Sequence, residues 1–186
     1  MSHKYENIEN FYDIYLKLQD IKRTGWIMRN IPAEKLETVA DHTLQVVVLA
    51  TTLCHEFKLN FDISKLVQMC FIHDLGEIII GDVAVIDKNY EEKKQYEDEA
   101  VTKLLEPLSD ETSKWYLSLW HELNDRETEL AKFVHQIDKI DAVMRAKKYA
   151  EYYNRPELFE EFYNHQVEAK TFEDSLIKDF FDSLKD

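Results

Sequence analysis

Apolar residues recur along most of the chain at steps of three and four positions, which is the period of an amphipathic α-helix. In the first such stretch, Ile8, Phe11, Ile14 and Leu18 fall on one face of the predicted helix. The same pattern predicts further helices over the ranges 38–57, 62–76, 90–105, 110–123, 128–155 and 159–180. The sequence therefore predicts about six or seven helices, which can bury their apolar faces only against one another.

Glycine and proline, the residues that most often end helices, occur only three times each. The segment 24–35 is predicted to be a loop, with Gly25 as the stop of the first helix. Pro156 is predicted to break the long helix before it, and the segment 78–82 to form a short apolar turn. So few turn residues argue against an all-β fold and against the glycine-rich loop of a nucleotide-binding fold. The prediction is an all-α fold, a compact multi-helix bundle in one domain spanning 1–186.

The charge balance limits the partners that the protein can bind. Lys and Arg number 23 against 37 Asp and Glu, which gives a formal net charge of −14. Such a protein is a poor binder of long nucleic acid or anionic membrane, so any phosphate that it handles must be small and met by a local positive group. No apolar run approaches the ~20 residues of a membrane span, and no signal peptide opens the sequence. We expect a cytoplasmic protein whose two cysteines, Cys54 and Cys70, pack in the core.

Four potential metal ligands fall on the buried faces of three predicted helices. His42 shares the apolar stripe of its helix, and His73 follows Met69 by one turn. Asp74 comes directly after His73, and Asp138 lies one turn beyond Val134. All four side chains are therefore predicted to point to the interior, while few basic residues share these stripes.

Two interpretations of these four residues compete. A lone buried histidine is commonly a hydrogen-bonded core residue, and a lone aspartate is commonly a helix cap or half of an ion pair. Buried carboxylates are costly unless a positive charge neutralises them, and one divalent ion would satisfy both acids and both imidazoles. A mixed nitrogen and oxygen donor set suits Mn, Fe, Co, Ni or Zn better than Ca.

The motifs around these residues resemble a known family. The segments VADHTLQV (39–46), HDLGEIIIGDV (73–83) and FVHQIDKIDA (133–142), with KRTGWIMRNI (22–31), resemble the 5′-deoxynucleotidase branch of the HD-domain superfamily of metal-dependent phosphohydrolases. The superfamily's signature is the order H…HD…D, which lies here within about 38–142. The resemblance implies an all-helical HD-domain fold, a homodimer, and hydrolysis of deoxyribonucleoside 5′-monophosphates to nucleoside and phosphate by metal-activated water.

The resemblance also implies roles for individual residues. One divalent ion (Co, Mn, Fe, Ni, Mg or Zn) would be held by His42, His73, Asp74 and Asp138. Glu77, one turn after His73, can overhang the same site and accept a proton from water. In the resembling enzymes the position of Asp82 contacts the substrate and helps to place the water, although a solvated helix end is the simpler interpretation of both acids.

The substrate would be held by residues of the segment 22–31. A guanidinium can bind a phosphate through two hydrogen bonds, and the indole of Trp26 can stack on a base or line the sugar pocket, unless it only packs under the loop. The family's best-known bacterial form has an arginine directly before the tryptophan, where this sequence has Gly25. Arg23 is the nearest substitute and Arg29 is the second candidate.

Two other functions remain open from the sequence. One is an HD-type phosphohydrolase acting on a phosphodiester or a triphosphate, which would call for more positive charge than this acidic chain displays. The other is a helical nucleotide-sensing or adaptor module in which the metal is only structural.

Overall fold

The computed structural model describes residues 5–82, 90–172 and 176–185, and in this part of the chain it has helices and no β-strand. The all-α prediction is confirmed. Seven helices have ten residues or more: α1 (Glu6–Leu16), α3 (Val39–Glu56), α4 (Ile63–Ile72), α6 (Tyr90–Leu105), α7 (Asp110–Asp125), α8 (Glu129–Tyr153) and α9 (Pro156–Glu168). Three are short: α2 (Thr24–Ile27), α5 (Glu77–Ile80) and α10 (Lys178–Ser183).

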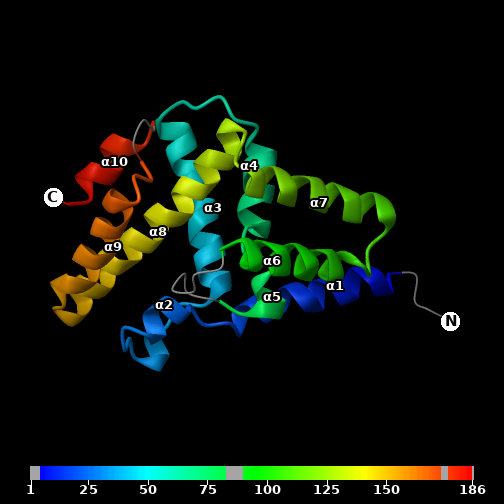
Figure 1. Ribbon diagram of the computed structural model, residues 1–186, viewed down its shortest axis with the longest axis horizontal. Helices are drawn as coiled ribbons and strands as arrows, with labels where there is room; N and C mark the ends of the chain where they lie inside the picture. Colours follow the sequence, from blue (N-terminus) through cyan, green and yellow to red (C-terminus); the bar gives the residue numbers. More distant parts are fainter. Residues whose placement is uncertain (1–4, 83–89, 173–175, 186) are drawn as a thin grey trace.

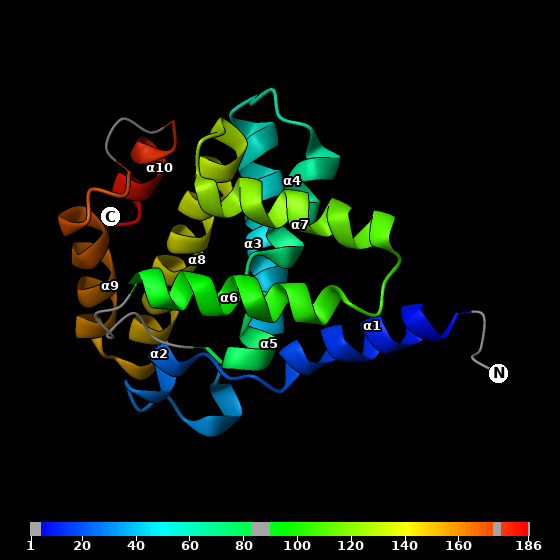
Figure 2. The ribbon, with the colours of Figure 1, turned by 45° about the vertical axis from the view of Figure 1, so that its right-hand side comes forward.

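Helices α3, α4 and α8 form the centre of the molecule. Figures 1 and 2 show α9 beside α8 on one side of this centre, and α1, α6 and α7 on the other. The central helices pack through apolar side chains that are fully buried, such as Val46 of α3, Met69 of α4 and Ile137 of α8. The burial of these stripes fixes the rotation of each helix, and so also fixes which polar residues face inward.

The N-terminal segment differs from its prediction. The first helix ends at Leu16 and continues as a 3-10 turn over Lys17–Gln19, and Gly25 lies inside α2, so the prediction that Gly25 stops the first helix is wrong. The segment 24–35 is also not all loop, because it contains α2 and a second 3-10 turn. The physical reason is the burial of Trp26, whose ring anchors α2 in a second apolar cluster formed with α8 and α9.

Several segments near helix ends also differ from the sequence-based expectation. The third predicted helix ends at Ile72 rather than near Gly76, and the apolar turn predicted at 78–82 is the one-turn helix α5 with a turn after it. α8 ends at Tyr153, the next residue Asn154 is in the left-handed conformation (φ 52°), and Pro156 begins α9, where its fixed φ suits the first helical position. The helix predicted over 159–180 is not continuous, because α9 ends at Glu168 and α10 begins at Lys178.

Two further sequence-based expectations concern the core and the surface. Cys54 and Cys70 are free thiols buried in the main apolar cluster, so their predicted packing role is confirmed. Within the described ranges, none of the helices combines the length and the apolar character that a bilayer span requires.

Candidate metal centre

A pairing between two N-terminal segments positions the start of α3. Lys22 and Thr38 form an isolated antiparallel bridge, in which the Val39 amide donates to the Ile21 carbonyl (2.9 Å). The Arg23 amide donates to the Glu37 carbonyl (3.1 Å). Arg23 is thereby brought beside the first turn of α3, which carries His42.

A capping box fixes the first turn of α3. The Thr38 hydroxyl accepts a hydrogen bond from the Asp41 amide (3.0 Å), and the Asp41 carboxylate accepts one from the Thr38 amide (2.9 Å). His42 is the fourth residue of this helix and is fully buried. The cap therefore fixes the turn of α3 on which His42 lies.

His73 and Asp74 lie where α4 ends. Asp62 caps the N-terminus of α4, and the buried residues Leu66 and Met69 set its rotation, so that His73 faces the centre. The Nδ1 of His73 lies 2.7 Å from the Cys70 carbonyl oxygen. A carbonyl only accepts, so Nδ1 carries the hydrogen and Nε2 is the nitrogen turned to the site.

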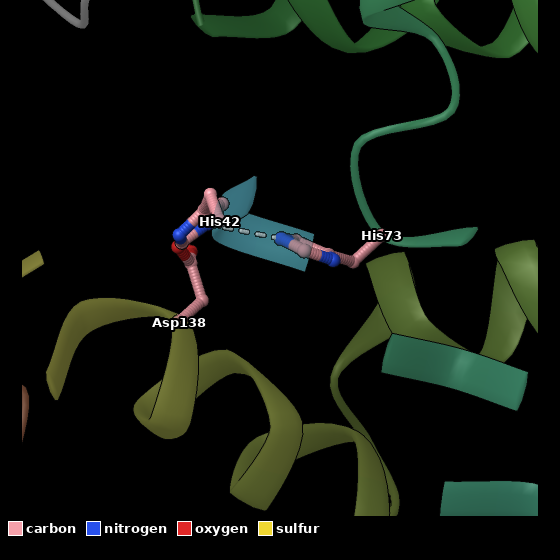
Figure 3. A group of neighbouring side chains, drawn as sticks. All are labelled: His42, His73 and Asp138. Carbon is pink, nitrogen blue, oxygen red and sulfur yellow. Dashed lines mark hydrogen bonds and ion pairs between the residues drawn. The ribbon is translucent and has the colours of Figure 1, made fainter. Parts of the chain in front are cut away.

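Helix α8 supplies two carboxylates to opposite edges of the His42 ring. Asp138 Oδ1 lies 3.1 Å from His42 Nε2, and Asp141 Oδ2 lies 2.7 Å from His42 Nδ1. Residues three apart on a helix share a face, which explains how one helix reaches both nitrogens. Figure 3 shows the side chains of His42, His73 and Asp138 approaching one another from α3, the end of α4 and α8.

The four predicted metal ligands are therefore brought together. The two Nε2 atoms of His42 and His73 are 3.2 Å apart, and Asp74 Oδ2 lies 3.1 Å from His73 Nε2 and 3.6 Å from His42 Nε2. One donor atom each from His42, His73 and Asp138 lie within 4.8 Å of one another. Two imidazole nitrogens with carboxylate oxygens at this spacing fit a divalent transition metal, since both Nδ1 atoms are already engaged and both Nε2 atoms face one point.

The charges of the site are shifted by its own members. Burial and Arg23 lower the pKa of His42, but the hydrogen bonds that the ring donates to Asp138 and Asp141 outweigh them and raise it to about 9. Burial raises the pKa of Asp74 and Asp138, yet the charges of His73 on Asp74 and of Lys139 on Asp138 hold both pKa values below the ordinary range. Both aspartates are thus ionised at neutral pH, as carboxylate ligands must be, whereas His42 must release the proton on Nε2 when a metal binds there.

Glu77 and Asp82 lie at the two ends of α5. Glu77 begins this helix, one turn after His73, and is 6% exposed. Gly81 follows α5 with φ 76°, a conformation that favours glycine, and the turn brings Asp82 back toward α2, where its carboxylate accepts a hydrogen bond from the Thr24 amide.

The three candidate substrate residues separate into two groups. Arg23 lies among the ligands, with a terminal nitrogen 3.4 Å from Asp74 and 3.8 Å from Asp82. Burial lowers its pKa, but Asp74, Asp82, Asp138 and Glu77 together raise it above the usual range.

Trp26 and Arg29 face α9 instead. Trp26 is 2% exposed, stacks on Phe162 at 4.6 Å between ring centroids, and meets the edge of Tyr149 at 5.1 Å. Arg29 pairs with Glu161, with Nε 3.1 Å from a carboxylate oxygen, and lies 4.5 Å over the Phe162 ring. The structure therefore brings Arg23 to the predicted metal ligands, whereas Arg29 pairs with the neighbouring helix.

Sequence reasoning missed four charged residues that surround the ligands. Asp141 and Glu37 are both buried, and Arg145 Nε lies 2.5 Å from Glu37 Oε2. Lys139 Nζ lies 2.8 Å from Asp138 Oδ2, so basic groups do reach the site. Only Asp141 had a usable signal, its position three residues after Asp138 on the same helical face.

Comparisons with known proteins indicate the family of the chain. Residues 16–176 match the model of the family described as HD domain. The chain is 34% identical over 149 residues to 5′-deoxynucleotidase HDDC2 of Mus musculus, an alignment that covers 80% of this chain and 72% of that one. It is 33% identical over 159 residues to the protein of that name from Bos taurus, covering 85% and 75%. A solved conserved hypothetical protein from Pyrococcus furiosus superposes with a TM-score of 0.75 at 28% identity, over 94% of each chain.

Proposed function

The chain belongs to the HD-domain family, and on this basis we propose that it is a metal-dependent phosphomonoesterase that hydrolyses nucleoside 5′-monophosphates, deoxy forms preferred. The observation that carries the proposal is the convergence of His42, His73, Asp74 and Asp138 at one partly buried point. The family match covers all four, which supports an HD signature within 38–142. We treat 1–186 as one HD domain, as the sequence predicts.

The proposed ligands of the ion are His42 and His73 through Nε2, with carboxylate oxygens of Asp74 and Asp138. Two imidazoles favour Mn, Fe, Co, Ni or Zn, whereas Mg prefers an all-oxygen site, so Mg is the weakest of the candidates. When bound, the ion supplies Lewis acidity, which lowers the pKa of water and offsets the charge of a phosphate.

The chain's own acids would manage the protons of the reaction. Water forms a bond to phosphorus while the bond from phosphorus to the 5′ oxygen breaks, and the leaving 5′ oxygen takes up a proton from solvent water. Glu77 is proposed to accept the proton of the attacking water, because it is a buried carboxylate one turn from His73. Asp82 is proposed to orient that water and the substrate, since its carboxylate is fixed by Thr24 and lies beside Arg23.

Arg23 is proposed to bind the phosphate. Its guanidinium already lies against the carboxylates of Asp74 and Asp82, so a dianionic phosphate entering there meets a positive charge within reach. Trp26 stays a prediction as a wall of the nucleotide pocket. Its burial against Phe162 and Tyr149 favours a role in anchoring the segment that carries Arg23.

Replacing Arg23 with alanine should lower kcat/KM about 10- to 100-fold, mainly through KM, because a hydrogen bond to a charged group contributes roughly 1.5–3 kcal/mol. The matched control is Arg29→Ala. Arg23 directly precedes α2, whereas Arg29 follows it and pairs with Glu161, so this variant removes the same kind of side chain from the far end of α2. We expect its kcat/KM to stay within about threefold of wild type. Steady-state kinetics with a deoxynucleoside monophosphate measure both, and a larger loss in the Arg29 variant would reverse the assignment.

The substrate class is tested by a panel. The folded protein is loaded with Mn²⁺, Co²⁺ or Zn²⁺ and offered deoxyadenosine, deoxyguanosine and thymidine 5′-monophosphates, their ribose counterparts, a nucleoside triphosphate and a cyclic dinucleotide. We expect phosphate release from the monophosphates, faster with deoxyribose. Turnover of only the triphosphate or the diester would favour another HD-type reaction, and no release from any monophosphate would contradict the substrate assignment.

The assembly proposed from the family resemblance is a homodimer. Leu44 and Val48, one turn apart on α3, are 60% and 57% exposed, and a second copy could cover this apolar pair. Light scattering should then give about twice the chain mass of 22.2 kDa. A monomeric mass at micromolar concentration would contradict the dimer. The cytoplasmic location stays a prediction from the sequence.

A further inference from the structure

Both histidines of the metal centre are held in the same way, through Nδ1. For His73 the acceptor is the backbone carbonyl of Cys70, at 2.7 Å. For His42 the acceptor is the Asp141 carboxylate, also at 2.7 Å. In each ring the opposite nitrogen, Nε2, then faces the shared centre, and the two Nε2 atoms are 3.2 Å apart.

The hydrogen on Nδ1 decides which nitrogen can bind a metal. A neutral imidazole carries one N–H and one lone pair, and an ionised carboxylate can only accept a hydrogen bond. Asp141 therefore keeps the hydrogen on Nδ1 and leaves the lone pair on Nε2. A carboxylate in this position also makes the ring a stronger electron donor, which a backbone carbonyl does less well.

Asp141 is the only acid at hydrogen-bonding distance from His42 Nδ1 among the described residues. The nearest Glu37 oxygen lies 3.9 Å from that nitrogen, and the other oxygen of Glu37 pairs with Arg145 at 2.5 Å. Asp141 is 6% exposed, so little water is available to replace it as the acceptor. The acceptor for His42 Nδ1 is therefore a single side chain, whereas the acceptor for His73 Nδ1 belongs to the backbone.

We propose that Asp141 is the positioning residue of the metal centre: its carboxylate fixes the tautomer and direction of His42, so that Nε2 is the ligand atom. This inference rests on the proposed function, because it takes His42 as a ligand. It goes further in predicting that metal affinity depends on a residue that is not itself a ligand.

The experiment compares Zn²⁺ affinity, by chelator competition, in wild type, Asp141→Ala and Asp141→Asn. The alanine variant should bind Zn²⁺ about 10- to 100-fold more weakly, the usual effect of losing such a partner. The asparagine variant should lose less, because its amide oxygen can still accept from Nδ1 but carries no charge. The matched control is Asp13→Asn, which removes the same charge from an exposed position on α1. Its Zn²⁺ affinity should stay within about threefold of wild type.

A second measurement needs no variant, so it still tests the proposal if Asp141→Ala fails to fold. In the Zn²⁺-loaded wild-type protein, nitrogen-15 NMR should show His42 with a hydrogen on Nδ1, in a hydrogen bond protected from exchange, and with Zn²⁺ on Nε2. A hydrogen on Nε2, or a folded alanine variant that binds Zn²⁺ as tightly as wild type, would overturn the role of Asp141. If wild type itself binds no divalent metal, the proposed function fails and this inference fails with it. If wild type binds Zn²⁺ and only the role of Asp141 is overturned, the proposed function stands, so the two failures are distinguishable.

Discussion

Replacing Asp138 with asparagine should reduce phosphate release by about a thousandfold or more and lower the bound metal in parallel. The carboxylate lies 3.1 Å from His42 Nε2, and its pKa is held below the ordinary range, mainly by Lys139 against the effect of burial. Asparagine keeps the shape but not the charge, and loss of a metal ligand removes several kcal/mol of stabilisation from the transition state.

The measurement for Asp138→Asn is activity together with elemental analysis of the same sample. Asp13→Asn serves as the control here as well, because it removes an equal charge from an exposed position on α1. A variant that keeps its metal and its activity would show that Asp138 is not a ligand. A variant that keeps its metal and loses activity would assign Asp138 to the protons of the reaction instead.

Replacing Glu77 with glutamine should lower kcat about 10²- to 10⁴-fold while metal content and Tm stay near their wild-type values. This is the range expected when a general base is lost, and glutamine matches the volume of the buried glutamate. The control is Glu111→Gln, an exposed position in the first turn of α7, which should leave kcat unchanged.

The Glu77 variant also separates an enzyme from a structural metal module. Loss of turnover with metal and stability retained means that the site is catalytic. If wild type has no phosphatase activity to lose, and metal removal alone unfolds the chain, the adaptor interpretation is correct. Loss of both metal and turnover in Glu77→Gln would make Glu77 part of the metal site rather than its base.

The helical faces were readable from the sequence because their signal is local. His42 and His73 fall on apolar stripes whose period is visible within one helix, and Asp138 falls on a similar stripe in α8. Which apolar stripes pack against each other depends on the tertiary structure and is not visible in the sequence. Polar residues on these stripes nevertheless had to face the same interior. That is why the convergence of these residues could be predicted before the arrangement of the helices was known.

The surroundings of the ligands could not be predicted in the same way. The pair between Glu37 and Arg145 joins residues far apart in the chain, and the bridge between Lys22 and Thr38 that brings Arg23 to the site has no local pattern. Gly25 was misread for a similar reason. Its helix-ending tendency is a weak local preference, and the burial of Trp26 beside it outweighs that preference.

The most direct test is an anomalous-difference map from crystals grown with Mn²⁺ or Co²⁺. We predict one strong peak within bonding distance of His42 Nε2, His73 Nε2 and carboxylate oxygens of Asp74 and Asp138. A peak on the Nδ1 side of His42, between Glu37 and Asp141, would contradict the proposed centre, because those three residues form the other buried group that could hold an ion. No peak near His42 in crystals of active protein would contradict it equally.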